Sequence, residues 1–199
     1  MAAGASSDLG AAIGPGCVVL MVGPSGAGKD AVLAAARRAL ATDPAFVFVE
    51  RVISRPPHAA EAHASLSAED FQAAASRGAY ALTWRAHNLH YGIPAPIDDD
   101  IRCSKTVVFN ASRGVVDDAR RRFARVHVVL IDCPMEVRAE RLALRGRETT
   151  EQIRARLARA ASGFDAASAD ARIDNSGPLD DGAARLVSIL RSVAPTRTV

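Results

Sequence analysis

The stretch Gly23-Pro24-Ser25-Gly26-Ala27-Gly28-Lys29-Asp30 decides the fold class of this chain of 199 residues. It has the pattern GxxxxGK, and it joins the apolar run Cys17–Gly23 to the helix-forming stretch Lys29–Leu40. Glycines at these positions allow successive backbone N–H groups to turn inward and hold phosphate oxygens. The helix that follows directs its positive end at the same anion, and Lys29 adds an ammonium group. A chance glycine-rich turn is the alternative, but the strand before the loop and the helix after it favour a phosphate-binding loop (P-loop).

Lysine is scarce in this sequence, which makes Lys29 informative. The chain has 25 basic residues, of which 23 are Arg and only Lys29 and Lys105 are Lys. One of the two lysines therefore lies where a P-loop requires an ammonium group, whereas no motif surrounds Lys105. The formal net charge is +3, and aromatic residues make up 5% of the chain. These values favour a protein that handles anionic small molecules over one that binds nucleic acid through its arginines.

Strands and helices are expected to alternate after the P-loop. Apolar runs at Lys105–Phe109 and Val126–Ile131 are typical of strands that are buried in a parallel sheet. Helices are expected at Val115–Phe123, between these strands, and from Pro134 to Leu144, after them. This alternation predicts a doubly wound α/β fold with the three-layer α/β/α architecture of the P-loop NTPases.

Three segments depart from this alternation. Residues 1–15 are predicted to be a disordered leader, and residues 16–199 a single domain. Residues 46–98 interrupt the rhythm with short strands and are interpreted as an inserted acceptor-binding subdomain. Residues 145–150 lie between two helices and are expected to form an arginine-rich lid. Because no apolar run is long enough to span a membrane and the leader lacks the features of a secretory signal, we expect a cytoplasmic protein.

The residue after the P-loop lysine is unusual. This position commonly holds a serine or threonine whose hydroxyl group binds Mg²⁺, but here it is Asp30. A carboxylate beside a triphosphate is repelled unless a metal ion, or water on a metal ion, lies between them. We therefore expect Asp30 to help hold Mg²⁺. The alternative is that Asp30 only complements the positive end of the helix.

Several arginines are candidates for binding phosphate groups. Arg145 and Arg147 lie in the expected lid and Arg156 on the next helix, where guanidinium groups could neutralise a transferring phosphoryl group. Arg55 follows a strand-like run and is a candidate clamp for a substrate phosphate, with Glu61 and His63 in the loop after it. The alternative for such a cluster is a solvated arginine surface in an arginine-rich protein.

The order of these motifs resembles the guanylate-kinase-like branch of P-loop kinases, over roughly Cys17 to Val193. The matching segments are Gly23–Asp30, Ile53-Ser54-Arg55-Pro56, Tyr91-Gly92, Arg141-Leu142, Arg145-Gly146-Arg147 and Arg156-Leu157. The resemblance implies that Arg55 binds the phosphate of an acceptor, that Arg145 and Arg156 bind phosphates from the lid, and that Asn175 lies near the adenine of ATP. His58 stands where guanylate kinases carry a second arginine, Asn110-Ala111-Ser112-Arg113-Gly114 replaces an acidic stretch, and the guanine-reading glutamate before Trp84 is absent.

These departures match a narrower family, because the sequence resembles ribose 1,5-bisphosphate phosphokinases of phosphonate degradation. The shared positions include Asp30, Glu61-x-His63, Trp84-x-Ala86-His87, Asn110-x-Ser112-Arg113 and Arg145-Gly146-Arg147-Glu148. The resemblance implies transfer of the γ-phosphoryl group of ATP, with Mg²⁺, to ribose 1,5-bisphosphate, which gives 5-phosphoribosyl 1-diphosphate (PRPP). It also implies a set of residues that contact the sugar bisphosphate: Arg55, Glu61, His63, Tyr91, Asn110, Ser112, Arg113 and Arg147.

Two other functions stay open from the sequence. The first is a nucleoside monophosphate kinase, which would use the same P-loop with a different acceptor. The second is a non-catalytic module of guanylate-kinase shape that binds partner proteins. The complete glycine loop with Lys29 argues against this second function, because a scaffold does not need to hold phosphate groups.

Overall fold

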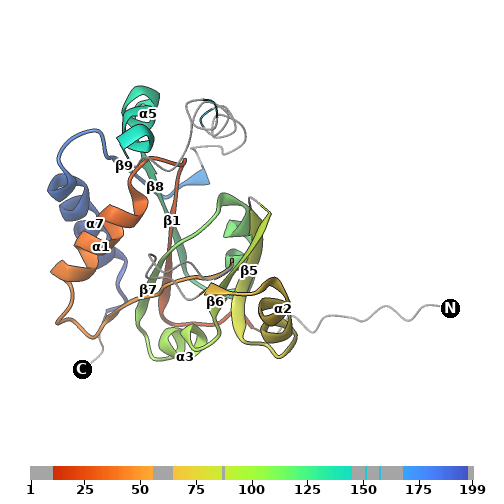
Figure 1. Cartoon of the computed structure of the whole chain (residues 1–199). Coiled ribbons are helices and arrows are strands. Elements are labelled where there is room, and N and C mark those ends of the chain that lie inside the picture. Colours follow the sequence, from red (N-terminus) through yellow and green to blue (C-terminus); the bar gives the residue numbers. More distant parts are fainter. Residues whose placement is uncertain are drawn as a thin grey trace.

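A computed structural model describes residues 11–55, 65–86, 88–144, 151, 157 and 168–196 of the chain. Its central feature is a sheet of five parallel strands, which confirms the predicted α/β fold (Figure 1). Across the sheet the order is β2-β7-β1-β8-β9. The strands comprise β1 (Cys17–Val22), β2 (Phe46–Phe48), β7 (Thr106–Asn110), β8 (Val126–Asp132) and β9 (Ala171–Asp174).

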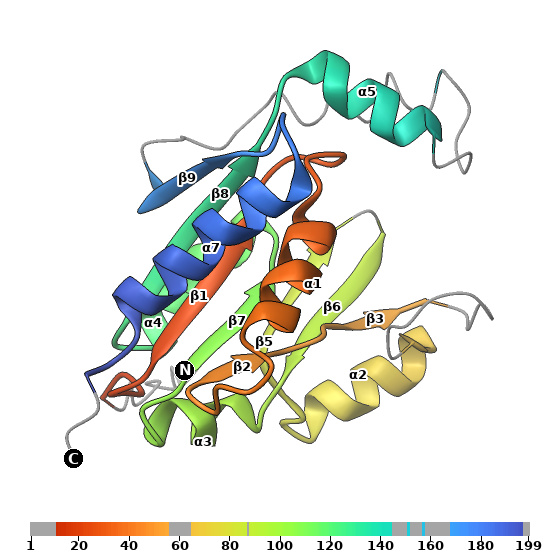
Figure 2. The same ribbon diagram turned by 90° about the vertical axis from the view of Figure 1, so that its left-hand side faces the viewer.

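Alternating side chains of β1 divide the core into two layers. All six residues of this strand are buried, as the apolar run predicts. Val19 and Met21 pack on the face covered by α1 (Lys29–Ala39) and α7 (Leu179–Val193). Val18, Leu20 and Val22 pack on the opposite face, because successive side chains of a strand point to opposite sides. Figure 2 shows α1 and α7 side by side across one face of the sheet.

A second sheet lies beside the first and carries residues of the expected acceptor-binding subdomain (Figure 2). Its strand order is β4-β3-β6-β5. The strands comprise β3 (Val52–Ser54), β4 (Ser65–Leu66), β5 (Tyr80–Ala86) and β6 (Leu89–Pro94). One face is covered by α2 (Ala68–Ser76), where Phe71 stacks on Tyr80 with ring centres 4.6 Å apart. The Ser67 hydroxyl accepts a hydrogen bond from Asp70 N at 3.0 Å, so Ser67 is the N-cap of α2.

The remaining elements surround the first sheet. They are α3 (Ile97–Arg102), the short 3₁₀ helix η1 (Arg113–Val115), α4 (Val116–Arg122) and α5 (Met135–Leu144). The Lys105 ammonium group lies 2.8 Å from an Asp100 carboxylate oxygen, so the second lysine of the chain joins β7 to α3. Within the described part of the chain, no helix is long and apolar enough to cross a membrane.

Three expectations from the sequence require correction. The leader was expected to extend through residue 15, but Ile13 forms a parallel bridge with Phe123, and its backbone bonds to Arg122 and Ala124. Residues 46–48 were assigned to the subdomain, but they form β2, an edge strand of the first sheet. The short elements β4 and α3 were missed, because segments of two and six residues carry too little periodicity to be recognised.

Candidate active site

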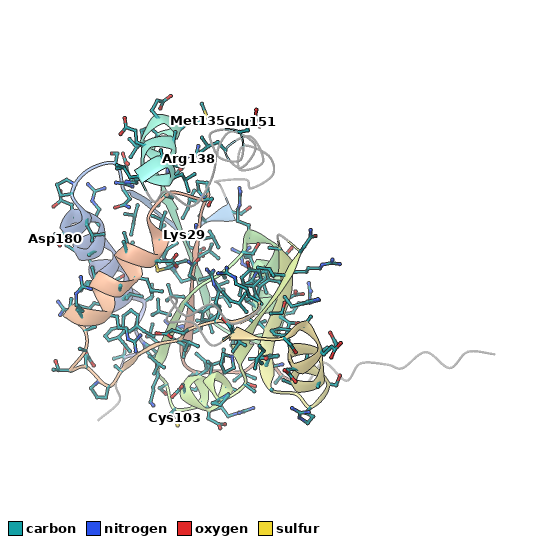
Figure 3. The ribbon with its side chains drawn as sticks, in the orientation of Figure 1. Lys29, Cys103, Met135, Arg138, Glu151 and Asp180 are labelled. Carbon is teal, nitrogen blue, oxygen red and sulfur yellow. The ribbon has the colours of Figure 1, made fainter. Side chains whose placement is uncertain are left out.

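The P-loop lies where β1 ends and α1 begins, as the GxxxxGK pattern predicts. Gly28 caps α1 with φ +87°, a left-handed conformation that glycine adopts at little cost. The Lys29 ammonium group donates hydrogen bonds to Gly23 O at 2.8 Å and to Pro24 O at 2.9 Å. These bonds place Lys29 against the loop itself, at the end of α1 that faces α5 (Figure 3).

Asn175 holds the P-loop in place through a hydrogen bond. Its side-chain amide donates a hydrogen bond to Ala27 O at 2.8 Å, and its own backbone N–H donates to Asp132 O at 2.8 Å. Only 3% of Asn175 is exposed, and its Oδ1 atom has no partner among the described residues. A Cβ atom added to Gly28 would lie 2.4 Å from Asn175 Nδ2. The glycine therefore makes room for the side chain that fixes the loop.

A pocket of about 260 Å³ opens beside the loop. It is lined by Gly28, Ala31, Arg141, Leu144, Asn175 and Leu179. Arg141 also donates a hydrogen bond to Cys133 Sγ at 3.7 Å, which ties α5 to the end of β8. Contact of Asn175 with an adenine ring stays a prediction. The hydrogen bond from Asn175 to Ala27 O in the P-loop was not predicted and is shown by the structure. Arg141 belongs to the segment Arg141-Leu142 that carries the family resemblance, but no role was assigned to it from the sequence.

Asp30 and Asn110 meet at the carboxyl-terminal edge of the parallel sheet. Asn110 is the last residue of β7, and its amide donates a hydrogen bond to Asp30 Oδ1 at 2.5 Å, although the two residues are 80 positions apart. Asn110 is 6% exposed and its Oδ1 atom lacks a partner among the described residues, whereas Asp30 is exposed. From the sequence, Asp30 was expected to hold the metal and Asn110 to bind the acceptor. In the structure the two side chains are hydrogen-bonded to each other.

Tyr91, a predicted acceptor residue, lies on β6 of the second sheet. Tyr91, which is 9% exposed, stacks on Trp84 with ring centres 5.4 Å apart. Trp84 packs against the core layer that contains Phe109, Ala111 and Val115. This layer reaches the end of β7.

Three further candidates lie on connecting segments. Ser112 and Arg113 follow β7 directly, at the start of η1, and η1 contacts β5. Arg55 follows β3 and is partly buried. Their contact with an acceptor stays a prediction.

One residue of this region was missed by the sequence reasoning. The Arg51 guanidinium group lies over the Tyr91 ring, 5.4 Å from its centre. The signal for it was its position four residues before Arg55 in a strand-like run. Other predicted residues lie outside the described part of the chain, namely Glu61, His63, Arg145, Arg147 and Arg156, together with the lid at 145–150.

Curated proteins similar to this chain share most of its length. The ribose 1,5-bisphosphate phosphokinase PhnN of Rhodopseudomonas palustris is 46% identical over 183 residues, which cover 92% of each chain. The protein of the same name from Brucella abortus is 51% identical over 164 residues, which cover 81% of this chain and 85% of that protein. No family model matches the sequence.

Solved structures resemble the fold at low sequence identity. A guanylate kinase from Anaplasma phagocytophilum aligns with a TM-score of 0.64 at 16% identity, covering 92% of this chain and 88% of that one. A gluconokinase from Sinorhizobium meliloti aligns with a TM-score of 0.52 at 20% identity, covering 90% and 94%. The fold is therefore that of guanylate-kinase-like kinases.

Proposed function

Because the chain belongs to the ribose 1,5-bisphosphate phosphokinase family, we propose that it transfers the γ-phosphoryl group of ATP to the 1-phosphate of ribose 1,5-bisphosphate. The products are PRPP and ADP. The observation that carries this proposal is the P-loop with Lys29, placed at the same sheet edge as the Asp30–Asn110 pair. The acceptor side is then formed by the face of the second sheet that carries Tyr91.

The P-loop binds the phosphates of ATP. The backbone N–H groups at the start of α1 point toward the anion, and the helix dipole adds to their attraction. Lys29 leaves the two loop carbonyls that it contacts and moves to the β- and γ-phosphates, because an ammonium group binds phosphate oxygens more strongly than neutral carbonyls. The pocket between Gly28, Arg141 and Asn175 is the place for the nucleotide base.

The donor atoms beside the loop fit a magnesium ion. Mg²⁺ prefers oxygen ligands and is held in kinases by one or two protein groups together with phosphates and water. The Asp30 carboxylate and the unpartnered Asn110 Oδ1 are oxygen donors of this kind. The described residues contain no group of three or more His, Cys, Asp or Glu side chains that could hold a metal ion by themselves, so these two donors would act together with phosphates and water. When bound, the ion neutralises charge on the triphosphate.

The acceptor needs no general base. Its attacking atom is an oxygen of the 1-phosphate, which is already anionic. This oxygen forms a bond to the γ-phosphorus while the bond from that phosphorus to the β,γ-bridging oxygen breaks, and the electron pair leaves with ADP. The protein contributes position and positive charge, since the transition state of phosphoryl transfer requires little else. Arg55 and Arg113 are the described residues that we assign to the acceptor.

The two lysines of the chain provide a matched test of this proposal. We expect the wild-type protein to form PRPP and ADP from ATP and ribose 1,5-bisphosphate, and to form much less ADP with GMP, AMP or UMP. Lys29→Ala should abolish the transfer. Lys105→Ala removes only the ion pair with Asp100, at the end of β7 away from Asn110, and should keep the transfer. Faster turnover with a nucleoside monophosphate, or near wild-type activity of Lys29→Ala, would contradict the proposal.

A further inference from the structure

Three side chains form a continuous stack on one face of the second sheet. The Arg51 guanidinium carbon lies 5.4 Å from the centre of the Tyr91 ring, and the Tyr91 and Trp84 rings lie 5.4 Å apart with planes 7° from parallel. Because Tyr91 is buried by its surroundings, the ring forms a fixed platform. A guanidinium group on such a platform is held in position while the N–H groups at its edge stay able to bind a ligand.

The charge of Arg51 has no carboxylate partner in the part of the chain that the structure describes. Other arginines in that part pair with acids, as Arg37 does with Glu50 and Arg122 with Asp98. Arg51 is only partly exposed, so its charge is not fully solvated. A partly buried, oriented guanidinium group without a carboxylate is suited to bind a phosphate group through two parallel hydrogen bonds.

The position of Arg51 directs it to the acceptor side of the site. Arg51 and Arg55 flank the three residues of β3, and Ile53 at its centre pairs with Tyr91. Because side chains alternate along a strand, Arg51, which directly precedes β3, shares the Tyr91 face with Ile53, and the chain bends at Arg55, whose N–H donates to Ile53 O at 3.0 Å. Trp84, at the end of the stack, packs on the core layer that reaches the carboxyl end of β7.

We propose that Arg51 binds the phosphate of the acceptor that does not react, which is the 5-phosphate of ribose 1,5-bisphosphate. This inference rests on the proposed function and adds a specificity-determining residue to it. A sugar bisphosphate presents two dianionic groups, and β3 holds a guanidinium group at each of its ends. A nucleoside monophosphate presents only one such group. Arg55 binds the reacting 1-phosphate, and Arg51 makes the site select a bisphosphate.

The test compares Arg51→Gln with Arg85→Gln. Arg85 is exposed and follows Trp84 in β5, so its side chain lies on the opposite face of the same sheet. We expect Arg51→Gln to raise KM for ribose 1,5-bisphosphate about 10- to 100-fold, the loss expected for a hydrogen bond to a charged group. The inhibition constant of ribose 5-phosphate should rise by a similar factor. The inhibition constant of ribose 1-phosphate, the KM for ATP and all values for Arg85→Gln should stay near wild type.

Several results would overturn the assignment. If Arg51→Gln raised the inhibition constants of ribose 5-phosphate and ribose 1-phosphate equally, or raised neither, Arg51 would not bind the 5-phosphate. Arg51→Lys serves as a control for a folding defect, because it keeps the positive charge. We expect its KM for ribose 1,5-bisphosphate to lie between those of wild type and Arg51→Gln, and its thermal unfolding midpoint to stay near wild type. If the wild-type protein forms no PRPP, the proposed function itself fails. If it forms PRPP and Arg51→Gln behaves like wild type, only the role of Arg51 fails.

Discussion

Replacing Gly28 by alanine tests whether Asn175 and the P-loop form one packed unit. The new methyl group would lie 2.4 Å from Asn175 Nδ2, closer than a Cβ atom can approach another heavy atom. Asn175 has little freedom to retreat, because it is 3% exposed and its backbone N–H is bonded to Asp132 O. The substitution should therefore break the hydrogen bond from Asn175 to Ala27 O.

The expected loss of stability has two parts. A left-handed backbone conformation costs an alanine about 1–2 kcal/mol. The broken hydrogen bond leaves buried polar groups unpaired, which costs about a further 1–3 kcal/mol. Gly78→Ala isolates the first part, because Gly78 has φ +74° and a Cβ atom there would meet nothing within 4 Å.

Thermal unfolding of the two variants measures the second part directly. For a chain of this size, a difference of about 1–3 kcal/mol lowers the midpoint of Gly28→Ala by roughly 2–12 °C relative to Gly78→Ala. In an Asn175→Ala background the obstructing side chain is gone, so Gly28→Ala should then cost about as much as Gly78→Ala. Equal midpoints for the two glycine variants, or the same cost of Gly28→Ala in both backgrounds, would refute the argument.

Three further predictions concern the metal, the acceptor and the thiols. Asp30→Ala should raise the Mg²⁺ concentration that gives half-maximal activity about tenfold, which corresponds to about 1.4 kcal/mol of lost binding free energy. An unchanged Mg²⁺ titration would exclude a metal role for Asp30. Arg113→Ala should raise KM for the sugar bisphosphate more than KM for ATP, and the opposite order in steady-state kinetics would remove Arg113 from the acceptor side. Burial raises the pKa of the Cys133 thiol, whereas Cys103 is exposed. At pH 7.5, iodoacetamide should therefore modify Cys103 and leave Cys133 unmodified until the protein unfolds. Peptide mass spectrometry would show which thiol has reacted. Kinase activity should survive this modification, because Cys103 lies at the lower edge of the molecule, away from Lys29 (Figure 3).

Much of the fold was predictable because its signals are local. The buried run of β1, the glycine loop and the helix after Lys29 are adjacent in sequence, and together they place the P-loop correctly. The helices expected at Val115–Phe123 and from Pro134 to Leu144 match α4 and α5 to within one residue at each end, because apolar periodicity extends over each of them. The edge strand β2 was assigned to the inserted subdomain and not to the parallel sheet, since pairing partners are not encoded within three residues.

The phosphate-binding loop, the parallel sheet and the family resemblance could be predicted from the sequence, because each depends on neighbouring residues or on the order of motifs. The contacts between distant residues could not be predicted in this way and are known from the folded structure. In the fold, Asn110 donates a hydrogen bond to Asp30, Asn175 donates one to Ala27 O, and the Arg51 guanidinium group lies over the Tyr91 ring. The physical reason is that parallel strands bring their carboxyl ends to one edge, so residues far apart in the chain share a site there. Strand register and side-chain packing, which no short segment specifies, then select which atoms come into contact.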